Sequence, residues 1–155
     1  MGWFARTGRV PLGYLGDAAK TARTFPVIGG VRCSVPGDRA RMRADGTLEL
    51  YGRDSVTINS GGEKIFAEEV EHAIKHHPAV YDAVVVGRPS ERWGSEVVAV
   101  VTLRPGATTT EAELLRECER HLARYKLPKA FVFRDEIVRS PSGKADYRWA
   151  RSQIV

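Results

Sequence analysis

A lysine near the C-terminal end of the chain stands where it could stabilise negative charge. The segment Ser140-Pro141-Ser142-Gly143-Lys144 places one ammonium group among small, turn-forming residues. It is not a Walker phosphate loop, which needs a glycine five residues before Gly143 and Ser or Thr after Lys144, because Val138 and Ala145 occupy those positions. A compact ammonium can stabilise charge that develops in a transition state. Standing alone, however, this motif is more often a solvated loop lysine, so these residues by themselves do not assign a role to Lys144.

A pair of glycines, Gly61 and Gly62, is the second candidate. The pair follows a β-prone run at 56–59 and, without Cβ atoms, allows positive φ and the close approach of a ligand. We expect a helix to start just beyond it, with Glu68 and Glu69 in the first turn, where the helix dipole favours negative charge. The apolar stripe of this helix is predicted at Val70, Ala73 and Ile74.

Other polar side chains have more than one interpretation. Asp38 follows Pro36-Gly37, so it is either a turn residue or a carboxylate able to accept from both hydroxyls of a diol. Arg53 is either a surface charge or a ligand contact. His72 and His76 are four residues apart on the predicted helix, but no third metal ligand is evident and we predict no metal site.

Alternating and continuous apolar runs predict the strands that position these residues. Residues 40–43 and 47–51 alternate around Ala44-Asp45-Gly46, which predicts a β-hairpin. The runs 83–87 and 96–103 are rich in valine and should pair antiparallel. Residues 130–134 predict a third strand. We therefore expect an α+β fold with a small three-stranded antiparallel sheet flanked by helices and preceded by a β-hairpin.

Two connecting segments complete this outline. Residues 88–94 read as a loop in which Trp93 is either packed in the core or exposed as a platform for a ligand. Thr110 and Glu113 form a capping-box pattern that opens a helix expected to run to residues 125–129. The buried side of that helix is predicted at Leu114, Leu115, Cys118 and Leu122.

Composition limits the class of protein. The 155 residues suffice for one domain of ordinary size, or for a small domain with a piece of another. Hydrophobic residues make up 43%, charged residues 28%, and no apolar run approaches the roughly 20 residues of a transmembrane helix. Two cysteines, Cys33 and Cys118, make no disulfide framework, which favours a reducing, cytoplasmic setting.

The net charge of +5 raises the question of nucleic-acid binding. Basic and acidic residues are interleaved along the chain, and no aromatic stacking motif accompanies them. We therefore expect no nucleic-acid partner. A mildly basic surface also suits small anionic ligands such as nucleotides.

The order of the motifs resembles the adenylate-forming enzymes, the acyl-CoA synthetase and ligase superfamily. The resemblance rests on Gly52-Arg53, Ser60-Gly61-Gly62-Glu63-Lys64-Ile65, Glu69-Val70-Glu71, Tyr125-Lys126-Leu127-Pro128 and Ser142-Gly143-Lys144, and it covers essentially the whole chain. The segments PGDRA (36–40) and INSGGEK (58–64) are most similar to the corresponding segments of bacterial fatty-acid–CoA ligases. The resemblance implies that residues 1–53 are the tail of a large N-terminal AMP-binding domain and that residues 54–155 are its mobile C-terminal lid.

The same resemblance implies roles for individual residues. Asp38 and Arg53 would bind the ribose of ATP or AMP, and Asp54 or Ser55 would be the hinge. Gly61, Gly62, Trp93 and Lys129 would bind CoA, with Lys126 as a further phosphate contact. Lys144 would reach the acyl carboxylate and the α-phosphate as the catalytic lysine.

The implied reaction is ATP-dependent and has two steps, acyl adenylation followed by thioester formation with CoA. ATP and CoA are the expected cofactors, with Mg²⁺ accompanying ATP and not bound by residues of this chain. The expected partners are the large adenylation domain, which is missing here, and a small acyl substrate. Because the phosphate loop and acyl pocket are absent, we expect the chain to be inactive alone. The alternatives are a non-catalytic module that binds a nucleotide or a protein partner, and adenylation for a carrier protein.

Overall fold

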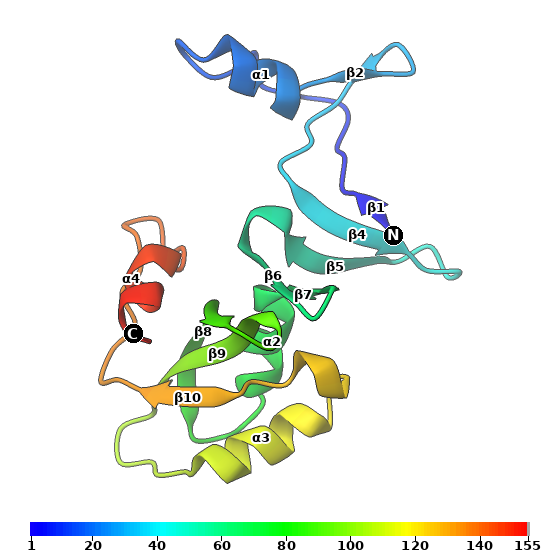
Figure 1. Ribbon diagram of the computed structural model, residues 1–155. Helices are drawn as coiled ribbons and strands as arrows, with labels where there is room; N and C mark the ends of the chain where they lie inside the picture. Colours follow the sequence, from blue (N-terminus) through cyan, green and yellow to red (C-terminus); the bar gives the residue numbers. More distant parts are fainter. Residues whose placement is uncertain (155) are drawn as a thin grey trace. The chain divides into compact units, whose positions relative to one another are not determined.

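The computed structural model describes residues 1–154, which form two compact units, 1–55 and 56–154. The expected boundary between residues 53 and 54 lies two residues before this division. Figure 1 shows the chain with most of its helices and strands labelled. None of the helices in residues 1–154 is both long enough and apolar enough to cross a membrane.

The first unit is built around the predicted hairpin. Its elements are β1 (Gly2–Trp3), α1 (Ala18–Thr24), β2 (Val27–Ile28), β3 (Val31–Arg32), β4 (Asp38–Met42) and β5 (Leu48–Arg53). Strands β4 and β5 pair antiparallel, which confirms the hairpin predicted from the alternation around Ala44-Asp45-Gly46. β1 adds a third strand on the other side of β4, and β2 and β3 form a separate small hairpin.

The second unit is organised on a three-stranded sheet. Its elements are the 3₁₀ turn η1 (Asp54–Val56), which begins before the division, β6 (Thr57–Ser60), β7 (Glu63–Phe66), α2 (Ala67–Ile74), β8 (Val80–Ser90), β9 (Gly94–Leu103), α3 (Glu111–Glu119), η2 (Arg124–Lys126), β10 (Ala130–Phe133) and α4 (Tyr147–Ser152). The strand order is β10-β9-β8, and β8 pairs antiparallel with β9 as predicted. Strand β10, however, runs parallel to β9, so the sheet is mixed and not wholly antiparallel. The crossover through α3 causes this, since it returns the chain to the end of the sheet where β9 began.

Both faces of this sheet are buried. Alternate residues of β8 and β9 pack on one side with α2 and α3, and on the other side with α4. Val85 and Ala99 belong to the first cluster, whereas Val84 and Val100 belong to the second. Burial on both faces explains why these strands read as continuous valine-rich runs and not as alternating ones.

The glycine pair makes a tighter turn than we expected. Gly61 and Gly62 both have positive φ, 58° and 87°, as a two-residue type I′ hairpin turn requires. The chain therefore returns as β7, paired antiparallel with β6, before α2 begins at Ala67. The sequence did not predict β7, the short strand that separates the glycines from the helix. The predicted acidic first turn of α2 is confirmed, as is the burial of its apolar stripe.

Two other predicted segments are shorter in the structure. The loop expected at 88–94 contracts to the turn 91–93, because β8 continues to Ser90. Pro89 is compatible with this strand since β8 lies at the edge of the sheet. The capping box of α3 is present, but the helix ends at Glu119 and does not run to residue 125. Beyond it the chain turns so that Leu122 and Leu127 enter the core.

Candidate functional site

Three segments far apart in the sequence converge on one cleft in the second unit. The cleft has a volume of about 520 Å³ and is lined by Ser60, Gly61, Glu63, Trp93, Arg124, Tyr125 and Lys129. Gly61 comes from the β6–β7 turn, Trp93 from the β8–β9 turn and Lys129 from the approach to β10. These are three of the four residues predicted to bind CoA. The fourth, Gly62, is in the same turn as Gly61 but does not line the cleft.

The two turns are fastened to each other. The Gly61 backbone N–H donates to the Trp93 carbonyl at 2.9 Å. A Cβ added to Gly61 would lie 2.9 Å from Cε3 of the Trp93 ring, closer than such atoms can approach. Glycine is therefore required here for two reasons, its positive φ and the indole ring packed against it. Trp93 remains 41% exposed, which favours the platform interpretation over core packing, and the Arg92 guanidinium lies 4.7 Å from the ring centroid.

The cleft combines aromatic surface with positive charge. Tyr125 is half exposed, and Arg124 and Lys129 are both exposed and also line the cleft. Lys129 is held through its backbone, whose N–H donates to the Val97 carbonyl at 2.8 Å, so its side chain projects from a fixed point. A ring that can stack on aromatic faces and a phosphate that can pair with cations both suit such a cleft.

Lys126 takes a different role from the one expected. Its ammonium lies 2.6 and 2.8 Å from the two carboxylate oxygens of Glu69 on α2, and it is mostly buried. This ion pair joins the η2 turn to α2. Arg124 and Tyr125, which sequence reasoning did not select as site residues, occupy the cleft in its place. Their position next to the Tyr125-Lys126-Leu127-Pro128 motif was the signal that could have identified them.

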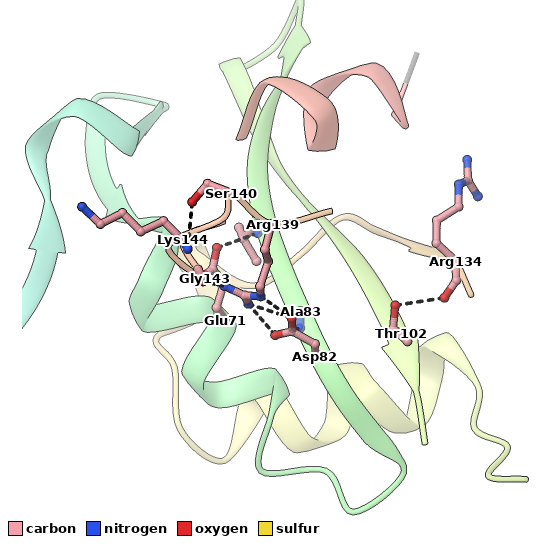
Figure 2. A network of polar contacts seen from close by, with 10 residues as sticks. Glu71, Asp82, Ala83, Thr102, Arg134, Arg139, Ser140, Gly143 and Lys144 are labelled. Carbon is pink, nitrogen blue, oxygen red and sulfur yellow. Dashed lines mark hydrogen bonds and ion pairs between the residues drawn. The ribbon is translucent and has the colours of Figure 1, made fainter. Parts of the chain in front are cut away.

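Hydrogen bonds within the loop that carries Lys144 join its two ends. The Ser140 N–H donates to the Lys144 carbonyl at 2.8 Å, the Gly143 N–H donates to the Ser140 carbonyl at 2.8 Å, and the Lys144 N–H donates to Ser140 Oγ at 3.2 Å. The Lys144 side chain is exposed and points away from the loop, as Figure 2 shows. Among the contacts of residues 1–154, no hydrogen bond or ion pair occupies its ammonium. The loop thus presents a lysine that is free to meet an external anion.

A buried carboxyl group lies close to this loop. Glu71 on α2 is 6% exposed, and one of its oxygens accepts from the Val85 N–H at 2.9 Å. Burial raises the pKa of Glu71 to about 7, with a smaller contribution in the same direction from Glu68. Burial likewise raises the pKa of the Tyr147 hydroxyl, helped by the negative charges of Glu71 and Glu68. The sequence did not identify Glu71 as a special residue, because an acidic residue on an amphipathic helix normally faces water.

The predicted ribose-binding residues lie together in the first unit. Asp38 and Arg53 are partners in the β4–β5 ladder, and Arg53 Nε lies 3.4 Å from Asp38 Oδ1. Both side chains remain partly exposed. The pair offers an acceptor and a donor side by side, which suits a vicinal diol.

Of the two hinge candidates, Asp54 is tied to the first unit. Its N–H donates to the Gly37 carbonyl at 3.2 Å, and its carboxylate pairs with Arg39 at 3.1 Å. Ser55 is exposed and is the last residue of that unit. A change of backbone direction is therefore easier at Ser55 than at Asp54.

The histidines form a stack of rings. His76 lies edge-on to His72 and face-to-face with His121, at centroid distances of 4.7 and 4.3 Å. His121 Nε2 is 3.0 Å from Glu117. Within residues 1–154, no group of three or more His, Cys, Asp or Glu side chains is arranged to hold a metal ion.

Comparisons with known proteins agree with this geometry. Residues 69–144 match the family model described as the AMP-binding enzyme C-terminal domain. The chain is 72% identical over 155 residues to the medium-chain acyl-CoA ligase Mig of Mycobacterium avium, and 57% identical over 153 residues to the 3-oxocholest-4-en-26-oate–CoA ligase of Rhodococcus rhodochrous. These matches cover 100% and 99% of the chain but only 28% of each relative, so the chain spans little more than a quarter of their length.

A solved structure shows the same fold. The amide bond synthetase McbA from Marinactinospora thermotolerans matches with a TM-score of 0.81 and 30% identity, over 93% of this chain and 29% of that one. Residues 69–144 of the chain are thus similar to the AMP-binding enzyme C-terminal domain.

Proposed function

We propose that the chain supplies the mobile lid of an ATP-dependent acyl-CoA ligase. In this proposal Lys144 serves acyl adenylation, and the cleft at Gly61, Trp93 and Lys129 serves thioester formation with CoA. ATP and CoA are the ligands, and Mg²⁺ enters with ATP without a ligand from this chain. The convergence of three residues from separate segments of the chain on one cleft is the observation that carries the proposal.

Two features of the second unit support a lid that works in two orientations. The loop of Lys144 is anchored near the start of β8 through Asp82, whereas Trp93 lies in the turn after its end. At about 3.3 Å per residue, Asp82 and Ser90 are separated by roughly 26 Å along the strand. A rotation of the unit could therefore bring first one and then the other region to the same reacting carboxyl group. Ser55 is the proposed pivot.

The lysine suits the first step for a physical reason. Adenylation builds negative charge on the α-phosphate as the acyl oxygen attacks and pyrophosphate leaves. An ammonium group that has no internal partner can approach that charge without first breaking an ion pair. Asp38 and Arg53 are proposed to hold the ribose hydroxyls from the first unit.

The cleft suits the second step. CoA carries an adenine ring and several phosphates, and the cleft offers Trp93 and Tyr125 for stacking and Arg124 and Lys129 for charge. The missing side chains at Gly61 and Gly62 would leave room for the pantetheine arm beside the turn. The relatives named above suggest a medium-chain fatty acid or a sterol side-chain acid as the acyl group.

The test is to mix the purified chain with the separately expressed large domain of a related ligase, ATP, Mg²⁺, CoA and a panel of fatty acids. AMP release is expected only from the mixture and should be lost with Lys144→Ala. Release by the chain alone would contradict the proposal. Lys75→Ala is a matched control, because it removes an exposed lysine of the same unit outside both candidate sites.

A second experiment separates CoA from a carrier protein as the thiol acceptor. Trp93→Ala should weaken CoA binding about 10-fold or more, since loss of one stacking platform costs about 1–3 kcal/mol. Isothermal titration of the chain with CoA measures this directly. Unchanged CoA affinity in Trp93→Ala would favour a carrier protein, for which the cleft would be a docking surface.

A further inference from the structure

The Lys144 loop is joined to the sheet by one arginine. Arg139 Nε and Nη2 donate to the two carboxylate oxygens of Asp82 at 2.8 and 2.7 Å, and Arg139 Nη1 donates to the Gly143 carbonyl at 3.0 Å. Asp82 Oδ1 also accepts from the Ala83 N–H at 2.9 Å. Figure 2 shows the guanidinium between the start of β8 and the residue next to Lys144. A single planar group therefore connects a buried strand to the catalytic loop.

We propose that Arg139 and Asp82 are positioning residues that fix the orientation of Lys144. This inference rests on the proposed function, in which Lys144 must meet the α-phosphate. The loop's own hydrogen bonds, between Ser140, Gly143 and Lys144, set its shape but not its direction. Arg139 sets the direction because the guanidinium is planar and rigid. With Nε and Nη2 bound to the Asp82 carboxylate, Nη1 is directed at the Gly143 carbonyl.

The ion pair is too exposed to act mainly on global stability. Its side chains are 33% and 17% exposed, and pairs of this kind contribute little to folding. Its effect is instead local, since the loop between Arg139 and Ala145 is otherwise held by an isolated bridge, by its internal turn and by the packing of Ala145 at its end. Displacing a catalytic group by about 1 Å can slow a reaction as much as 100-fold.

The chain contains a matched control pair. Arg88 and Glu96 join β8 and β9 through contacts of 2.6 and 2.9 Å, with side chains 39% and 20% exposed. This pair resembles Arg139–Asp82 in chemistry and burial, but none of its hydrogen bonds or ion pairs within residues 1–154 reaches the Lys144 loop. Loss of the Arg88–Glu96 pair should change the stability of the unit about as little as loss of the Arg139–Asp82 pair does. It should leave the Lys144 loop unchanged.

The first measurement uses the purified chain alone. Backbone ¹⁵N relaxation should show order parameters at Gly143 and Lys144 falling from about 0.85 to below about 0.6 in Arg139→Gln and Asp82→Asn. Amides of β9 should be unaffected, and Arg88→Gln should leave the loop rigid. A charge-reversed double variant, Asp82→Arg with Arg139→Asp, can restore an ion pair but not the donor to Gly143, so its loop should stay mobile. A rigid loop in Arg139→Gln would overturn the inference.

The second measurement is adenylation by the chain mixed with a large domain. Arg139→Gln and Asp82→Asn should lower kcat about 10- to 100-fold with little change in KM for ATP, whereas Arg88→Gln should not. Lys144→Ala is assayed in parallel. If Lys144→Ala retains activity, the proposed function fails. If Lys144→Ala is inactive while Arg139→Gln and Asp82→Asn retain full kcat, the positioning role fails and the proposed function stands.

Discussion

Replacing the buried carboxyl of Glu71 should remove a specific pH dependence of stability. In the folded chain burial raises the pKa of Glu71 from 4.5 to about 7, so the folded state keeps a proton that the unfolded state loses. The stability that this provides is fully present below pH 4.5 and is lost as the pH rises through 7. At about 1.36 kcal/mol per pKa unit, the total loss is about 3 kcal/mol.

Glu71→Gln imitates the protonated side chain. The glutamine oxygen can still accept from the Val85 N–H, and the amide can donate toward Tyr147, whose raised pKa keeps its hydroxyl protonated. At pH 4.5 the variant and the parent chain should therefore be about equally stable. At pH 8.5 the variant should be more stable by about 3 kcal/mol, because it buries no negative charge.

The assay is urea unfolding at several pH values from 4.5 to 8.5. A Trp3→Phe background confines the fluorescence to Trp93 and Trp149, which both lie in the second unit. All other ionisable groups are common to both proteins, so their contributions cancel in the difference. A difference that does not change with pH would refute the reasoning. It would mean that Lys75 and Arg139, which act to lower the pKa of Glu71, offset its burial.

Two further substitutions test local features of the second unit. Gly62→Ala should destabilise the unit by the roughly 1–2 kcal/mol that a left-handed backbone costs a residue with a Cβ. Gly61→Ala should cost more, because only at Gly61 would the Cβ meet Trp93. Urea unfolding measures both costs, and in a Trp93→Ala background the difference between them should disappear. Thr110→Ala should cost about 1 kcal/mol of unfolding free energy by breaking the capping box with Glu113, and an unchanged urea midpoint would show that this cap contributes nothing.

Local sequence signals predicted the elements whose contacts are close in the chain. The β4–β5 hairpin followed from the turn at Ala44-Asp45-Gly46, the start of α3 from its capping box, and the antiparallel pairing of β8 and β9 from two valine-rich runs with a short connection. In each case the stabilising contacts lie within about 20 residues of one another.

Features that depend on distant contacts were missed. The direction of β10 depends on how the crossover packs, which residues 130–134 do not encode by themselves. Glu71 looked like an ordinary helix acid until Tyr147 and β8 covered it. Arg139 and Asp82 are 57 residues apart, so no local sequence pattern could predict that they pair.

The site was predicted unevenly for the same reason. Gly61, Trp93 and Lys129 were selected as candidates because motifs marked each of them, and the fold places all three around one cleft; their role in binding CoA stays a prediction. Lys126 carried a similar motif signal, but Glu69 lay within reach and paired with it. A motif thus identified candidate positions, whereas the neighbours of each side chain decided whether it stayed accessible.

The most direct test of the central claim is ATP–pyrophosphate exchange, which reports adenylation without requiring CoA. The large domain of a related ligase, stripped of its own lid, is assayed with a fatty acid, alone and with increasing amounts of this chain. We predict that the chain raises the exchange rate in a saturable manner and that Lys144→Ala, added at the same concentration, does not. An equal stimulation by Lys144→Ala, or none by the unaltered chain, would contradict the claim that this chain supplies the catalytic lysine of an adenylating lid.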